Sequence, residues 1–188
     1  MAEVQPIRGR KQIKDIGNYL KGKDEKYYIM FLIGVQSGLR VSDVLNLQVS
    51  DIDSMSSRKI KEKKTNKKRF LYLNDRTEKE IRRYIVSHEL ESDDYLVYSR
   101  KHDQYGDRQP ITRTQAYRVL REAGEAFGID ALGTHTMRKT FGYHYYKKTH
   151  DVVTLMRIFN HASQSVTLHY IGIEEEEIRQ SLDDFYLF

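Results

Sequence analysis

The longest apolar stretch of the chain is YYIMFLIGV, which covers residues 27–35. It is far shorter than the ~20 residues that a membrane span needs. Asp24 precedes it as a candidate helix cap, and Gly38 follows it as a candidate helix stop. We therefore expect a helix through YYIMFLIGVQS in a soluble protein. A further helix is predicted over residues 10–21, where Ile13, Ile16 and Leu20 recur at helical spacing.

The remaining pattern predicts mostly helices. Ser42 is a candidate cap for a short helix, Thr77 begins another, and Thr112 or Thr114 caps one that ends before Gly128. Several helices with short breaks are expected from residue 134 onward.

Two strands are expected in the middle of the chain. Residues 59–63 and 68–73 favour strands, with Thr65-Asn66 near the turn between them. Residues 95–98 are at most a short strand. The predicted fold class is mainly α with a small antiparallel hairpin.

Composition limits the type of protein. A length of 188 residues fits one domain, or one domain with a small appendage. The hydrophobic fraction of 39% supports a core, and cysteine is absent, which excludes disulfides, thiolate zinc sites and cysteine nucleophiles. No secretory signal is visible at the start of the chain. We expect a cytoplasmic protein.

Positive charge is concentrated in one segment. Residues 58–69 read RKIKEKKTNKKR, with eight basic residues and one acid, whereas the net charge of the chain is +5. Such a patch attracts polyanions through phosphate neutralisation, although charge alone fits a solvated turn equally well. Residues 171–188 hold six acids and one Arg.

Several polar residues lie where packing does not require them. Arg40 follows Ser-Gly-Leu, and His135 and Arg138 are three residues apart, which places them on one face of a helix. His161 follows Ile-Phe-Asn at an expected helix end, and Tyr170 lies nine residues later. Taken singly, each has an ordinary structural explanation.

Together these residues occur in an order that resembles the tyrosine recombinase (phage integrase) family over nearly the whole chain. SGLRVSDVLNL is similar to the family's first arginine box, and THTMRKTFGYH to its His-x-x-Arg box. FNHASQSVTLHYIGI is similar to the box with the second histidine and the tyrosine. KKTNKKRFLYL is similar to the hairpin with the family's lysine, which assigns Lys64; charge alone leaves Lys63 or Lys67 equally open.

The resemblance implies a site-specific recombinase that cleaves and rejoins DNA through a 3′-phosphotyrosine. Tyr170 would be the nucleophile and His135 the base that takes its proton. Arg40 and Arg138 would stabilise the charged transition state, and His161 would donate to the scissile phosphate. Lys64 would protonate the leaving 5′-oxygen. Neither ATP nor a metal or other cofactor is required.

Neighbouring residues would support this chemistry. Asp43 is expected to orient Arg40 or to help cap the short helix. Positions around Lys64 would grip phosphates of double-stranded DNA without reading sequence: Lys59, Lys67, Lys68 and Arg69. One departure is Lys139, where many relatives have His.

The resemblance also predicts the domain organisation of the chain and its assembly. We expect residues 1–188 to form a single catalytic domain, without the N-terminal clamp domain that relatives usually carry. The tail over residues 171–188 looks helical, with apolar Ile178, Leu182 and Phe185. In the family such a helix docks into a neighbouring protomer, which implies self-assembly on DNA; folding back onto its own core is the alternative.

Three other functions remain open at this point. One is a non-catalytic DNA-binding regulator on the same fold. Another is a monomeric enzyme that nicks and closes DNA. The last, outside the family, is a basic DNA- or RNA-binding domain whose function would not depend on Tyr170.

Overall fold

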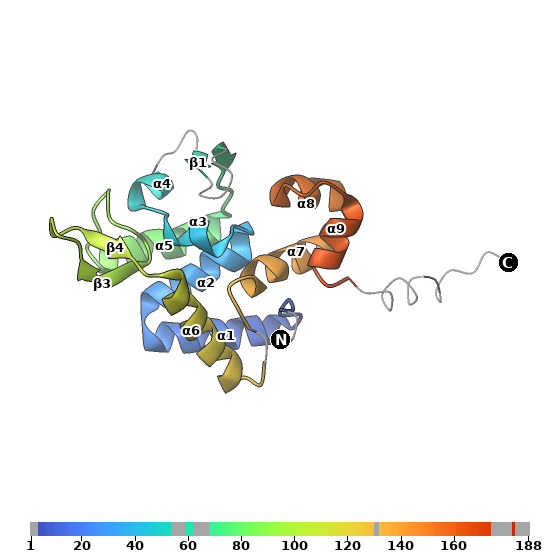
Figure 1. Ribbon diagram of the computed structural model, residues 1–188, viewed down its shortest axis with the longest axis horizontal. Coiled ribbons are helices and arrows are strands. Elements are labelled where there is room, and N and C mark those ends of the chain that lie inside the picture. The colour runs from blue at the N-terminus through green and yellow to red at the C-terminus, as the bar shows by residue number, and fades with distance from the viewer. Residues whose placement is uncertain (1–3, 54–58, 62–67, 130–131, 174–181, 183–188) are drawn as a thin grey trace.

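The structure is a computed structural model that describes residues 4–53, 59–61, 68–129, 132–173 and 182. Within these ranges the chain is mainly helical with two antiparallel strand pairs, as predicted for the fold class (Figure 1). The longer helices are α1 (Arg10–Lys23), α2 (Glu25–Ser37), α5 (Asp75–Ser87), α6 (Arg113–Ala126) and α7 (Thr136–Thr149). The shorter helices are α3 (Val41–Leu45), α4 (Val49–Asp53), α8 (Val152–Phe159) and α9 (Gln164–Tyr170).

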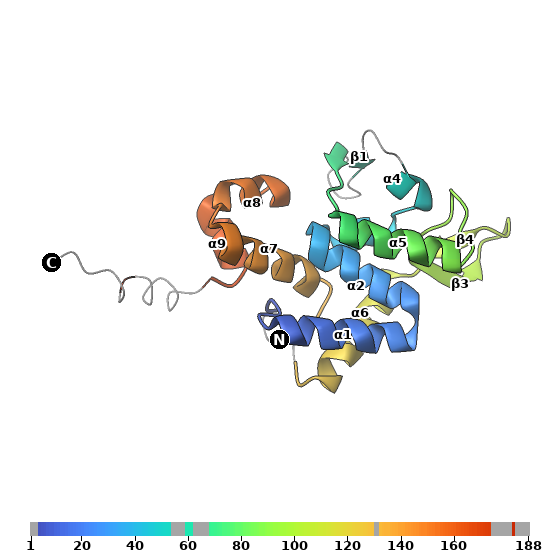
Figure 2. The same cartoon turned by 180° about the vertical axis from the view of Figure 1, so that it is seen from behind.

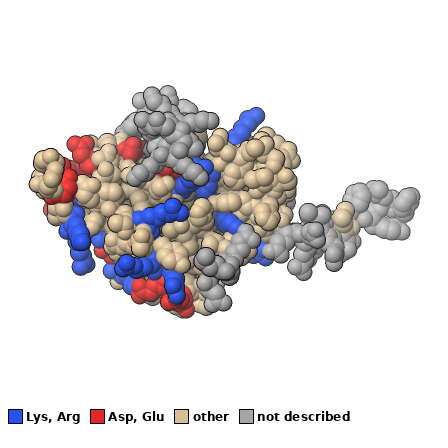
Figure 3. All heavy atoms as spheres, in the orientation of Figure 1, with Lys and Arg blue, Asp and Glu red and all other residues tan. Residues whose placement is uncertain are grey.

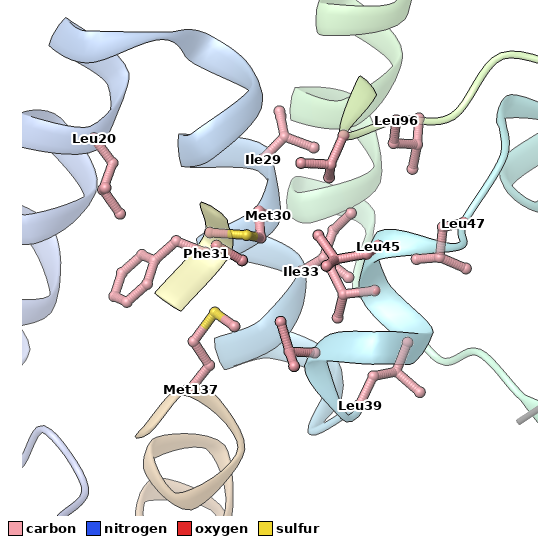
Figure 4. Close-up of a cluster of buried hydrophobic side chains, with 14 of the residues drawn as sticks. Leu20, Ile29, Met30, Phe31, Ile33, Leu39, Leu45, Leu47, Leu96 and Met137 are labelled. Atoms are coloured by element: carbon pink, nitrogen blue, oxygen red, sulfur yellow. The ribbon is translucent and has the colours of Figure 1, made fainter. Parts of the chain in front are cut away.

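Helix α2 is the centre of the main core. It packs against α1, α5 and α7, which surround it in both views (Figures 1 and 2). Its buried side chains include Ile29, Met30 and Ile33, and Figure 4 shows Leu20 and Met137 from neighbouring helices beside them. A helix that is apolar on most sides is stable only when it is covered, so the apolar run over residues 27–35 has become the core helix.

The predicted ends of α2 are confirmed. The Asp24 side chain accepts a hydrogen bond from the Lys26 amide at 3.2 Å, and Gly38 ends the helix with a φ of 63°. A Cβ at Gly38 would lie 2.5 Å from Cδ1 of Phe141. Glycine is therefore required here both by the left-handed backbone and by the close approach of α7.

Three predicted helix starts have different outcomes. Ser42 lies inside α3 and does not cap it, because the backbone is already helical from Val41 and the N-cap is Arg40. Helix α5 starts before Thr77, since the Asn74 side chain accepts from the Thr77 amide at 3.0 Å and so caps the helix earlier. Thr112, the first of the two alternatives, caps α6.

The central hairpin is confirmed, but the strand expected over residues 68–73 ends at Phe70. Strands β1 (Lys59–Lys61) and β2 (Lys68–Phe70) pair antiparallel. Their predicted turn at Thr65-Asn66 lies outside the described residues.

A second hairpin was not predicted. Strands β3 (Tyr98–His102) and β4 (Arg108–Pro110) pair antiparallel. Residues 95–98, expected to be at most a short strand, hold an isolated bridge from Tyr95 to Gln48 and the first residue of β3. This hairpin is polar and largely exposed, so it lacks the apolar alternation that reveals a strand. Its turn is held by the Asp103 side chain, which accepts from the amides of residues 105 and 107.

The last third of the chain forms a second, smaller cluster. Leu155, Phe159 and Ile171 are its buried centre, and the aromatic run at the end of α7 packs around them. The N-terminal segment contacts both units, because Ile7 packs in the main core while Nη2 of Arg8 donates to the Gly172 carbonyl at 3.1 Å. No helix in the described part of the chain combines the length and apolar character that crossing a bilayer requires.

Candidate active site

Five of the predicted residues come together from four separate parts of the chain. Arg40 follows α2, His135 and Arg138 lie at the start of α7, His161 follows α8, and Tyr170 is the last residue of α9. A pocket of about 140 Å³ lies among the first three of these residues. It is lined by Arg40, Val41, Ser42, Arg113, Thr134, His135 and Arg138.

Arg138 is the buried centre of the site, with 3% of its surface exposed. Its Nη1 donates to the Gly38 carbonyl at 2.5 Å and its Nη2 to the Phe159 carbonyl at 2.8 Å. The guanidinium also lies over the Phe159 ring, 4.2 Å from its centroid. These contacts fix the plane of the charge and join the turn after α2 to the end of α8.

Arg40 is placed by that same turn. Its backbone is extended, and its carbonyl accepts from the amides of Asp43 and Val44 at 2.9 and 3.0 Å. The side chain is partly exposed and faces the pocket. Asp43 is buried in α3, one turn away, and its predicted role of orienting Arg40 stays a prediction.

The nucleophile candidate contacts the base candidate directly. Nδ1 of His135 lies 3.3 Å from the Tyr170 hydroxyl. If the phenol donates, Nδ1 is the acceptor and the ring hydrogen of neutral His135 is on Nε2. This is the arrangement that a proton transfer from Tyr170 to His135 requires.

The surroundings keep both groups neutral before reaction. Partial desolvation, followed by the positive charges of Arg113, Arg138, Lys139 and Arg40, lowers the pKa of His135. Burial raises the pKa of Tyr170, while the charge and hydrogen bonding of Arg138 and the charge of Arg40 act in the opposite direction. A neutral imidazole therefore faces a neutral phenol at physiological pH.

His161 is held at the end of α8. Asn160 adopts a left-handed conformation with a φ of 53°, and the His161 amide donates to the Met156 carbonyl at 3.0 Å. The imidazole Nδ1 lies 3.1 Å from Oγ1 of Thr167, and the ring packs edge-on to the Tyr170 ring at 5.2 Å. Desolvation and the charges of the two site arginines lower the pKa of His161.

Arg113 was not predicted to belong to the site, and Lys139 was noted only as a departure at a supporting position. Arg113 is the first residue of α6 and lines the pocket, whereas in the sequence it is only one of 32 basic residues. Lys139 is buried, with its Nζ 5.3 Å from the centroid of the Tyr170 ring. The sequence signal for Lys139 is its place directly after Arg138.

The lysines predicted around the site lie in or next to the part of the chain that the structure leaves out. Lys64 and Lys67 lie outside the described residues, and Lys59, Lys68 and Arg69 are described only as members of β1 and β2. Figure 3 shows Lys and Arg side chains across the middle of one face, with Asp and Glu mostly toward its margins. Over the described ranges, no group of three or more His, Asp or Glu could hold a metal ion.

Comparison with known proteins identifies the fold. The phage integrase family matches residues 9–177. The chain is 42% identical to the probable integrase/recombinase YoeC of Bacillus subtilis (strain 168), over 97% of each chain. The crystal structure of XerA recombinase shares the fold, with a TM-score of 0.74, 21% identity, and coverage of 100% of this chain and 66% of that one.

A second solved structure is XerH, bound to palindromic difH substrate in a post-cleavage complex. The TM-score is 0.73 at 18% identity, over 98% of this chain and 54% of that one. The chain thus spans nearly all of YoeC but only about half to two-thirds of these solved recombinases. With the family match covering almost the entire sequence, the chain belongs to the phage integrase family, the tyrosine recombinases that cleave and rejoin DNA strands.

Proposed function

We propose that this chain is a site-specific DNA recombinase in which Tyr170 attacks a DNA phosphodiester. The observation that carries the proposal is the 3.3 Å contact between the Tyr170 hydroxyl and Nδ1 of His135, beside two guanidiniums. The attack forms a 3′-phosphotyrosine and releases a 5′-hydroxyl. A different 5′-hydroxyl then attacks the phosphotyrosine, which exchanges strands and frees Tyr170 without an external energy source.

The proton of Tyr170 passes to His135 as the phenolic oxygen bonds to phosphorus. The positive charges around His135 lower its pKa, so the base is neutral at physiological pH. The same charges oppose a long-lived imidazolium, which favours return of the proton when Tyr170 leaves. The base is therefore suited to a reversible reaction.

The two arginines stabilise the charge that develops on the non-bridging oxygens. Arg138 is rigid, because two of its donors are fixed on backbone carbonyls and its ring contact holds its plane. Arg40 is more exposed and lines the same pocket, where it would meet the phosphate of a bound DNA. Charges that are already oriented need no reorganisation in the transition state.

The remaining roles follow from the family resemblance. Lys64 protonates the leaving 5′-oxygen, and Lys59, Lys67, Lys68 and Arg69 hold phosphates on either side of it. The likeness to DNA-bound XerH supports double-stranded DNA as the partner. We also propose that the protein acts in the cytoplasm and that residues 1–188 fold as one catalytic domain.

Self-assembly through the tail is a further part of the proposal. An apolar pocket of about 570 Å³ lies between the end of α2, the segment that follows β2, α7 and α8. Its apolar lining includes Leu39, Leu71, Phe141, Tyr145 and Ile158. Such a surface suits Ile178, Leu182 and Phe185 from a second copy. Cross-linking of the tail to the pocket in trans on DNA tests this part.

The test of the chemistry is a covalent adduct. A DNA site is first selected by binding of Tyr170→Phe to a random duplex pool, and is then nicked at successive positions so that religation fails. We expect the unmodified protein to form an adduct that survives denaturation, and Tyr170→Phe to form none while binding the same DNA.

The matched control is Tyr105→Phe, a change of the same kind on the exposed second hairpin. It should form the adduct at the normal rate. Binding of the selected site without any adduct at any nick position contradicts the proposal and leaves a non-catalytic DNA-binding regulator.

A further inference from the structure

Thr167 lies on the same helix as Tyr170 and contacts His161. It is fully buried on α9, three residues before Tyr170, and its hydroxyl meets the His161 ring. Thr167 Oγ1 lies 3.0 Å from the Ser163 carbonyl and 3.1 Å from Nδ1 of His161. None of the roles described so far uses this residue.

The single hydroxyl hydrogen decides the direction of both hydrogen bonds. The Ser163 carbonyl can only accept, so the Thr167 hydroxyl donates to it. In the opposite orientation, two oxygen acceptors would face each other at 3.0 Å without a hydrogen between them. Oγ1 therefore accepts from His161, and the hydrogen of the neutral His161 ring is on Nδ1.

This tautomer affects how His161 can bind a phosphate. Neutral His161 has a bare lone pair on Nε2, and a phosphate oxygen is also an acceptor. A hydrogen bond between them forms only after Nε2 gains a proton. The charged and titratable groups that face the ring are Arg40 before α3, Arg138 from α7 and Tyr170 from α9.

We propose that Thr167 is a positioning residue that holds the hydrogen of His161 on Nδ1, so that His161 binds the scissile phosphate only as an imidazolium. The role in phosphate binding rests on the proposed function. Before DNA binds, desolvation and the two arginines lower the pKa of His161, so the ring is neutral. An arriving phosphate carries negative charge, which offsets the arginines and favours proton uptake.

The tautomer is measured directly by nitrogen NMR of the imidazoles in DNA-free protein at alkaline pH, with the His161 signals assigned by their loss in His161→Gln. We expect His161 protonated on Nδ1 in the unmodified protein and in Thr167→Ser. In Thr167→Val we expect it protonated on Nε2. Thr149→Val is the matched control, because Thr149 makes the same bond to the carbonyl four residues earlier but lies at the exposed C-terminal end of α7.

The consequence for catalysis is measured as the pH dependence of adduct formation on the nicked site. In the unmodified protein the rate should fall on the alkaline side, where His161 bound to phosphate loses its proton. In Thr167→Val this alkaline fall should disappear, and the rate at neutral pH should drop on the order of 10-fold because the ring is no longer held. Thr167→Ser should show the alkaline fall and the rate at neutral pH of the unmodified protein. Backbone amide spectra verify that each variant is folded.

Each contrary outcome overturns the proposal. One is an Nε2-protonated His161 in the unmodified protein. Another is an alkaline limb that is unchanged in Thr167→Val, which would leave Thr167 a purely structural role. A Thr167→Ser variant that behaves like Thr167→Val would also show that the hydroxyl is not the acting group. If the unmodified protein forms no adduct, the proposed function fails, whereas the NMR experiment still decides the arrangement of Thr167 and His161.

Discussion

Replacing Gly38 with alanine tests how the turn between α2 and α3 holds the two arginines. The residue has a φ of 63°, and its carbonyl accepts from Arg138. A Cβ there would lie 2.5 Å from Cδ1 and 2.9 Å from Cε1 of Phe141. Alanine is therefore strained by its backbone and also overlaps a packed ring.

The expected loss of stability in Gly38→Ala has three contributions. The left-handed backbone costs alanine about 1–2 kcal/mol. The more restricted unfolded chain offsets about 0.4–1 kcal/mol of that cost. The overlap with Phe141 adds about 1–3 kcal/mol, as in other overpacked sites. We expect Gly38→Ala to lower the free energy of unfolding by about 1–5 kcal/mol.

Comparison with Gly128→Ala separates the effect of the overlap with Phe141 from the cost of the left-handed backbone. Gly128 has a φ of 66°, and among the described residues no heavy atom lies within 4 Å of the place that an alanine Cβ would take. Urea unfolding followed by circular dichroism should show Gly38→Ala to be less stable than Gly128→Ala by about 1–3 kcal/mol. In a Phe141→Leu background this difference should shrink. Equal stabilities of the two alanine variants would refute the reasoning.

Three further results are expected. Arg113→Gln should raise the pKa of His135, as measured by NMR titration, and should move the acid limb of the adduct-formation rate to higher pH. Arg118→Gln on the same helix should leave both the pKa and the acid limb unchanged. Arg138→Lys should lower the free energy of unfolding by about 1.5–3 kcal/mol, because one ammonium cannot bond to both backbone carbonyls. An unchanged midpoint of urea unfolding would contradict this. Because the pKa values of His135 and His161 are lowered by folding, the unfolded chain binds more protons below about pH 6.5, so the unfolding free energy should decrease as pH falls through that value. Replacing both histidines with glutamine should flatten that decrease.

The sequence predicted the helices well because their signals are local. The caps at Asp24 and Thr112 and the stop at Gly38 act within one turn, so spacing alone revealed them. The second hairpin was missed because it is polar and exposed, and its turn depends on side-chain bonds of Asp103. Ser42 was misplaced because a residue that can cap a helix can also lie inside one.

The order of the residues predicted which five side chains come together, but it did not predict their protonation or tautomers. Arg113 is far from His135 in sequence, yet its charge is the largest influence on the pKa of His135 after desolvation. Thr167 differs little from other buried threonines until its distance to His161 is known. Protonation and tautomers depend on contacts between segments, which spacing along the chain does not report.

Arg138 explains why the site spans two packing units. Tyr170 packs with the small cluster around Phe159, whereas Arg40 follows the core helix α2. The Arg138 guanidinium donates to a carbonyl on each side, so the group that would stabilise the transition state also links the segment that carries Arg40 to the cluster that holds Tyr170. A conservative change to lysine keeps the charge but loses that link. Arg138→Lys should therefore slow adduct formation by more than the loss of one hydrogen bond to the phosphate would, because the two packing units are no longer linked. Added salt should not restore the rate.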